Sequence, residues 1–121
     1  MQPIIKTNIV QDPPADPSGL KQHEPGAKLD QGKIRAGLVL KGFSHALKSV
    51  SAVGTFGANK YSDNGWMDVE NGINRYTDAM LRHMLEEFSG HDHDEETELL
   101  HAAHTAWNAL AILELKLRKL S

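Results

Sequence analysis

Cysteine is absent from the sequence, and its absence excludes two kinds of structure. Without thiols the chain can form neither a disulfide framework nor a thiolate zinc site, and this composition suits the reducing cytoplasm, which is the expected location. No run of about 18 apolar residues is present, so no segment is expected to span a membrane. The N-terminus also lacks a basic segment followed by an apolar stretch, so we expect no secretion signal.

Proline is confined to one end of the chain, and the net charge is small. All five prolines fall within the first 25 residues, a segment without apolar periodicity, and residues 1–27 are therefore predicted to be an extended arm before a helical domain at 28–121. The net charge is −3, which does not favour binding to nucleic acid or to an anionic membrane. Because no alternation of apolar and polar residues is long enough for strands, the predicted fold class is all-α.

Helical spacing of apolar residues predicts a small bundle of three main helices, at 38–56, 73–89 and 95–120. Gly90 is suited to end the second helix, and Asp94 is predicted to cap the start of the third. Residues 57–72 have turn chemistry and are expected to form a loop, with room for a short helical turn. The third helix is apolar on nearly every side, so we expect burial on most sides and at least a homodimer.

Polar residues interrupt the apolar faces of the last two helices. His83 and Glu87 lie four residues apart on the second, away from its charged face of Arg75, Asp78, Arg82 and Glu86. The third carries a stripe of three polar residues at i, i+3 and i+7: His101, His104 and Asn108.

Two helices joined by a short connection bring positions equidistant from it together, so we expect a shared pocket for His83, Glu87, His101 and His104. Asp94 or Glu96 from the acidic connection is expected at its rim. A divalent cation is the simplest common partner of carboxylates and imidazoles, and buried polar groups need partners. The alternatives are solvent-exposed border residues, core histidines bonded to the backbone or to each other, and a merely solvated acidic turn.

A glycine-marked basic segment precedes the first helix. From Gly26 to Lys33 it approximates a phosphate-binding P-loop, but the glycine spacing differs, Ile34 replaces the required hydroxyl and no strand comes before it. A P-loop is therefore rejected. Lys28, Lys33 and Arg35 can still hold phosphates as point charges, the alternative being an exposed loop.

Several motifs occur together in a fixed order over residues 26–115. They are Gly26-x-Lys28-x-Asp30-x-Gly32-Lys33-x-Arg35, Thr55-Phe-Gly57-Ala-x-Lys60-Tyr61, Asn64-x-Trp66, Leu81-Arg-His83 and Asp94-x-Glu96-Thr-x-Leu99-x-His101-x-Ala-His104-x-x-x-Asn108. This pattern resembles a family of small phage proteins named for dATP/dGTP diphosphohydrolase activity, of the N-terminal-domain type. The chain departs from the family pattern at Glu98, where a glycine is usual.

The resemblance implies a helical, metal-dependent nucleotide hydrolase, similar to MazG-type all-α pyrophosphohydrolases, with Mg²⁺ or Mn²⁺ as cofactor. The MazG-type carboxylate motifs are not reproduced, because Glu86-Glu87 is followed by Phe-Ser-Gly and the second motif is replaced by His101-x-x-His104. Either the ligands are rearranged, with Asp94 and Glu96 contributing, or the metal is softer than magnesium, or the catalytic site is lost. The expected metal ligands are His83, Glu87, Asp94, His101 and His104. The expected catalytic residues are Glu87, Glu96 and His104. The expected substrate-binding residues are Lys28, Lys33, Arg35, Lys60, Tyr61, Trp66 and Asn108.

The function that follows is hydrolysis of purine deoxynucleoside triphosphates to monophosphate and pyrophosphate. Two alternatives stay open: a non-catalytic nucleotide-binding protein that sequesters a nucleotide signal, and a structural phage protein. The first alternative needs the basic and aromatic groups without the metal cluster, whereas the second predicts neither binding nor turnover.

Overall fold

A computed structural model describes residues 13–120 of the chain and shows an all-helical architecture. The elements in chain order are α1 (Ala36–Gly42), α2 (Ser44–Lys60), the 3₁₀ helix η1 (Gly65–Asp68), α3 (Gly72–Phe88) and α4 (His101–Leu120). No β-sheet forms among these residues, although His93 and Leu100 make an isolated antiparallel bridge. The predicted all-α class is therefore confirmed.

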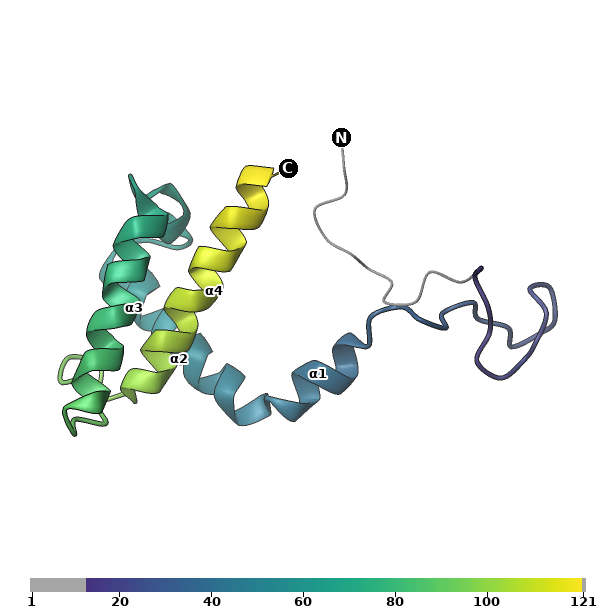
Figure 1. Ribbon diagram of the computed structural model, residues 1–121, viewed down its shortest axis with the longest axis horizontal. Helices are drawn as coiled ribbons and strands as arrows, with labels where there is room; N and C mark the ends of the chain where they lie inside the picture. Colours follow the sequence, from purple (N-terminus) through teal and green to yellow (C-terminus); the bar gives the residue numbers. More distant parts are fainter. Residues whose placement is uncertain (1–12, 121) are drawn as a thin grey trace.

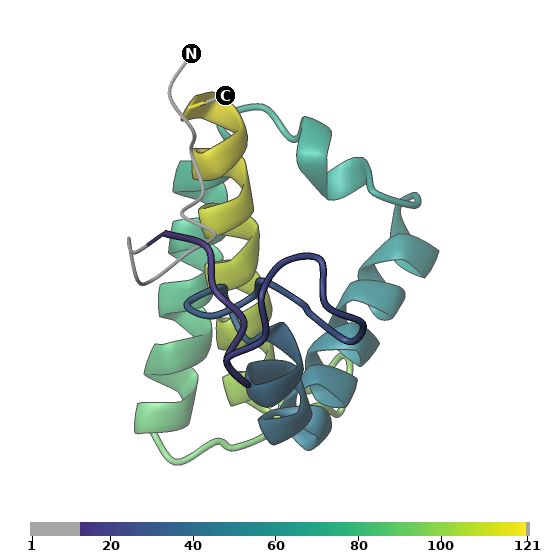
Figure 2. The ribbon, with the colours of Figure 1, turned by 90° about the vertical axis from the view of Figure 1, so that its right-hand side faces the viewer.

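The centre of the fold is the pair α3 and α4, which lie side by side and run in opposite directions (Figure 1). Helix α2 packs against α4, and η1 joins α2 to α3 across the other end of the pair (Figure 2). Small side chains allow the close approach, since Val53 of α2 and Ala103 and Ala111 of α4 are buried. Helix α1 leads away from this body (Figure 1).

Aromatic rings close the end of the body formed by η1. Trp107 of α4 receives Trp66 and Tyr76 edge-on, with ring centroids 5.7 and 5.6 Å away, and the Tyr76 hydroxyl donates to the Trp66 carbonyl at 2.7 Å. Edge-to-face pairs of this kind add about 0.5–1.5 kcal/mol beyond the area that they bury. This cluster therefore fixes η1 and α3 to α4.

The first predicted helix is interrupted and also longer than expected. Phe43 leaves helical geometry between α1 and α2, and α2 then continues through Gly57 to Lys60 rather than ending near residue 56. The Tyr61 N–H still bonds the Gly57 carbonyl at 2.9 Å, so that glycine does not end the helix. The short helical turn expected between the first two helices is η1.

Helix α3 lies where the periodicity placed it, and its end is built as expected. Gly90 adopts a positive φ of 97°, and the N–H groups of Gly90 and His91 bond the carbonyls of Glu87 and Glu86. A glycine is favoured there because the left-handed conformation costs it little.

The predicted start of the last helix at residue 95, capped by Asp94, was wrong. The Asp94 N–H instead bonds the Leu99 carbonyl and the His101 N–H bonds the Asp92 carbonyl, both at 2.8 Å. Glu98 takes a positive φ of 61°, which a helix cannot accommodate. These contacts hold residues 91–100 as a folded-back loop, so α4 begins only at His101.

The burial of α4 also differs from expectation in the single chain. Its buried residues include the polar stripe of His101, His104 and Asn108, whereas Leu110 and Leu113 are about half exposed, at 49% and 52%. The polar side of the helix therefore faces inward.

The segment before α1 forms turns organised by one buried carboxylate. Asp16 accepts bonds from the N–H groups of Ser18 and Lys28, both at 2.6 Å, and these bonds lower the pKa of Asp16. The first twelve residues of the predicted arm lie outside the described residues.

Candidate functional site

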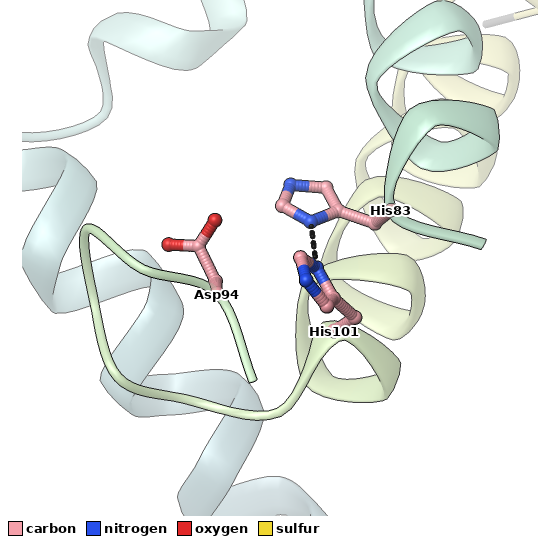
Figure 3. A group of neighbouring side chains, drawn as sticks. All are labelled: His83, Asp94 and His101. Carbon is pink, nitrogen blue, oxygen red and sulfur yellow. Dashed lines mark hydrogen bonds between the residues drawn. The ribbon is translucent and has the colours of Figure 1, made fainter. Parts of the chain in front are cut away.

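Three histidines meet where α3 and α4 lie side by side, and we call them the histidine cluster: His83, His101 and His104. The Nδ1 atoms of His83 and His101 are 2.8 Å apart, so one of the two nitrogens carries a hydrogen that the other accepts (Figure 3). The rings of His83 and His104 stack with centroids 4.3 Å apart and planes 8° apart. The predicted convergence of these three side chains is present in the structure.

Asp94 reaches the cluster from the loop before α4. Its Oδ2 atom accepts from the Thr97 N–H at 2.9 Å and from the Thr97 hydroxyl at 3.0 Å. The Thr97 Oγ1 atom also lies 2.7 Å from His104 Nε2. Because a carboxylate only accepts, Thr97 donates to Asp94 and accepts from His104, which places the imidazole hydrogen on Nε2. Thr97 therefore holds Asp94 and His104 in fixed orientations.

Burial and neighbouring groups shift the pKa values of His83, His104 and Asp94. Burial lowers the pKa of His83, and the nearby His104 lowers it further; burial likewise lowers the pKa of His104, against the opposing effect of Asp94. For Asp94, burial raises the pKa, but the bonds from Thr97 and the adjacent imidazoles outweigh it and lower the value overall. Neutral imidazoles and an ionised carboxylate at neutral pH are the forms that ligate metals.

The ligand atoms of His83, Asp94 and His101 all lie within 4.8 Å of one another (Figure 3). Separations of this size are compatible with one shared ion, whose bonds to imidazole and carboxylate are about 2.0–2.2 Å long. Two imidazoles and one carboxylate are a common donor set for a divalent ion, and three protein ligands leave positions open to water or substrate. The residues present therefore fit a divalent cation. His104 contacts this group but is held by Thr97 and does not belong to it.

The cluster opens onto a large cavity of about 1220 Å³ between α2, α3 and the loop before α4. His83, Asp94 and His104 line one part of its wall, and Trp66 and Tyr76 line another. Lys60 at the end of α2 binds both carboxylate oxygens of Glu96, at 2.9 and 3.1 Å. Since α2 and the loop are otherwise separate elements, this ion pair ties together two sides of the cavity.

The remaining predicted site residues have different positions. Glu87 is exposed on α3 and does not enter the cluster. Tyr61 is 77% exposed at the cavity edge, whereas Asn108 is buried and donates to the His104 carbonyl at 2.8 Å. Three predicted phosphate-binding residues lie before α1 and do not line the cavity: Lys28, Lys33 and Arg35.

Sequence reasoning missed four residues that line or organise this site. Thr97 gave no signal by itself, because only the folded loop brings its hydroxyl between Asp94 and His104. Tyr76 lay on the same helical stripe as His83, which was a usable signal. Arg75 and Arg82 were assigned to a charged face, and only the packing of α2 and the loop turns that face into a cavity wall.

These features define an all-α protein with a candidate metal centre at the edge of a ligand-sized cavity. The chain belongs to the dATP/dGTP diphosphohydrolase N-terminal family, whose sequence model matches residues 23–121. It is 39% identical over 90 residues to a Salmonella phage PMBT28 protein named dATP/dGTP diphosphohydrolase. The match covers 74% of this chain and 29% of that protein, so the chain spans less than a third of its relative's length.

The family resemblance inferred from the motifs is thus confirmed. No solved structure matches the chain. Among the helices of residues 13–120, none combines the length and the apolar character required to cross a bilayer.

Proposed function

We propose that this domain binds dATP or dGTP together with a divalent cation in the large cavity and hydrolyses it to the monophosphate and pyrophosphate. The observation that carries the proposal is the convergence of His83, Asp94 and His101 beside a cavity that also has cationic and aromatic walls. Membership of the family and the name of the phage relative support the substrate class.

The charge of the cavity supports the need for a cation. Its lining contains three cationic side chains, Lys60, Arg75 and Arg82, and four acidic ones, so its net charge is −1 when the histidines are neutral. A triphosphate carries several negative charges, and the cavity alone cannot neutralise them. A divalent ion held by His83, Asp94 and His101 would add two positive charges and make this end of the cavity favourable for phosphate.

His83, Asp94 and His101 would hold the ion. When bound there, a divalent cation polarises a phosphoryl oxygen and lowers the pKa of an attacking water. Two imidazoles among three ligands suit Mn²⁺ better than Mg²⁺, which prefers oxygen ligands. Manganese is therefore the preferred cofactor.

The other residues of the site would hold the ligand side chains in position and accept a proton during the reaction. Water attacks the α-phosphorus, the bond from this phosphorus to the α–β bridging oxygen breaks, and pyrophosphate leaves. Glu96, held at the cavity wall by Lys60, accepts the proton of the water. Thr97 keeps the Asp94 carboxylate and the His104 imidazole in place throughout.

The test is product analysis with the purified chain, the four deoxynucleoside triphosphates and either Mn²⁺ or Mg²⁺. We expect pyrophosphate and a monophosphate from dATP or dGTP, faster with Mn²⁺. His101→Ala and Asp94→Asn should lose turnover and Mn²⁺ binding while circular dichroism remains helical. Glu87→Gln is the matched control and should keep both.

The outcomes separate the proposed hydrolase from the alternatives. Orthophosphate as the product would contradict cleavage between the α- and β-phosphates. Tight nucleotide binding without any product would favour the non-catalytic binding protein. Mn²⁺ binding that needs Glu87 but not His101 would refute the ligand set.

A further inference from the structure

Helix α3 carries a charged stripe that is exposed to solvent and also lines the large cavity. Arg75, Asp78 and Arg82 follow one another at intervals of three and four residues, so they share one side of the helix. All three line the cavity that also contains His83 and Asp94. The stripe is therefore solvent-exposed and at the same time part of the cavity wall.

The three cations of the cavity are not equally available to a ligand. Lys60 is held by both oxygens of Glu96, and Arg75 donates from Nη1 to the Glu70 carbonyl at 3.2 Å. Within residues 13–120, Arg82 has neither an ion pair nor a hydrogen bond through its guanidinium group, even though Asp78 lies one turn earlier. Its five N–H donors are therefore free for a ligand.

The position of Arg82 relates it to the candidate metal centre. It directly precedes His83, and both side chains line the same cavity. The aromatic residue Tyr76 lies seven residues before His83 on α3, which corresponds to about 10 Å along a helix. Arg82 thus lies toward the metal-binding end of the cavity, and Tyr76, preceded by Arg75, lies toward the other end.

We propose that Arg82 binds the β- and γ-phosphates of the nucleotide and stabilises the departing pyrophosphate, while the base points along α3 toward Trp66 and Tyr76. This inference rests on the proposed nucleotide hydrolysis and names a substrate-binding residue for it. The planar guanidinium group can donate two parallel bonds to phosphate oxygens, which a lysine ammonium group cannot do. Such charge-assisted bonds account for roughly tenfold to hundredfold in affinity.

The experiment compares three probes by calorimetric titration in the presence of Mn²⁺: α,β-methylene dGTP, inorganic tripolyphosphate and deoxyguanosine. We expect Arg82→Ala to weaken the binding of α,β-methylene dGTP and of tripolyphosphate by roughly tenfold to hundredfold, and to leave the binding of deoxyguanosine unchanged. Arg82→Lys should recover part of the loss. Arg118→Ala is the control, because Arg118 is exposed on α4, pairs with Glu114 and does not line the cavity.

Several results would overturn the inference. Equal binding of tripolyphosphate by the wild type and Arg82→Ala would do so. Arg82→Ala that loses deoxyguanosine binding as strongly as tripolyphosphate binding would also do so, because that result indicates a collapsed site. Absence of analogue binding by the wild type would also refute it.

Turnover of dGTP distinguishes this inference from the proposed hydrolysis. Arg82-dependent binding without pyrophosphate release would refute hydrolysis and keep the phosphate site. Turnover with the same kcat/KM in the wild type and Arg82→Ala would keep hydrolysis and refute the role of Arg82.

Discussion

At the scale of single residues, the site depends on polar side chains that the fold buries together. His101, His104 and Asn108 are 5%, 8% and 5% exposed, values more typical of apolar core residues. Each has a partner: His83 for His101, Thr97 for His104, and the His104 carbonyl for Asn108. Since unpaired buried polar groups cost about 1–3 kcal/mol each, these bonds make the burial possible.

Glu98 carries a backbone strain that one substitution should relieve. Its φ of 61° lies in the left-handed region, where a side chain costs about 1–2 kcal/mol and glycine does not. We expect Glu98→Gly to raise the free energy of unfolding by about 1 kcal/mol, measured by urea denaturation. The control Glu95→Gly, in the same loop and exposed, should give no gain. Equal stability of the wild type and Glu98→Gly would contradict this account.

The buried histidines make the stability of the metal-free protein depend on pH. The pKa values of His83 and His104 are lower in the folded chain than the ordinary 6.5, so the unfolded chain binds protons more readily. The free energy of unfolding should therefore be highest above pH 6.5 and should fall as the pH drops below it toward the folded pKa values. Thermal melts in EDTA between pH 8 and 5 measure this.

His104→Gln is the comparison for that pH series. Removing one titrating imidazole should make the fall in stability shallower. A melting temperature that rises as the pH drops would show that the histidines are stabilised in the charged form instead.

At the scale of elements, the approach of α2 to α4 depends on a missing side chain. A Cβ atom on Gly54 would lie 3.0 Å from Nε1 of Trp107, whereas one on Gly57 would meet nothing within 4 Å. Both glycines are inside α2, where alanine is favoured by about 0.5–1 kcal/mol. Glycine at position 54 therefore lowers the stability of α2 itself but allows α2 to pack closely against α4.

These two glycines form a matched pair for mutation. Gly57→Ala should raise the melting temperature, because the gain in helix propensity meets no steric cost. Gly54→Ala should be less stable than Gly57→Ala, because Trp107 must move and disturb its contacts with Trp66 and Tyr76. Thermal denaturation followed by circular dichroism checks both, and the reverse order would show that α2 is not packed on Trp107.

At the scale of the whole molecule, apolar side chains are left uncovered in the single chain. Helix α1 buries none of its residues, and Leu38, Leu40 and the adjoining Phe43 are more than half exposed, at 59%, 54% and 57%. Leu110 and Leu113 of α4 are also about half exposed. Exposed apolar surface of this extent is typical of an interface between chains.

We therefore predict at least a homodimer, to be measured by sedimentation velocity at micromolar concentration. Leu38→Asp should shift the protein toward monomer, because it places a charge in the apolar surface of α1. Lys41→Asp, on the same helix, changes the charge without removing apolar surface and should leave the assembly intact. A monomeric wild-type chain would refute the interface.

The sequence alone determined the helical class, the approximate position of α3 and the meeting of His83 with His101 and His104. Periodicity of 3.6 residues fixes which side chains share a helix face, and offsets from the connecting loop fix which faces meet. The family motifs followed from residue order alone, without any coordinates.

Only the tertiary structure decided which carboxylate joins the histidines. Glu87 lies on α3, one turn after His83, yet it faces solvent, whereas Asp94 reaches the cluster because backbone hydrogen bonds within residues 92–101 fold its loop back. Only the folded chain places Arg82 in the cavity wall. The folded-back loop also makes α4 begin at His101 rather than at residue 95. Backbone hydrogen bonds inside an irregular loop, such as His101 to Asp92, leave no periodic trace in the sequence, so they could not be predicted from it.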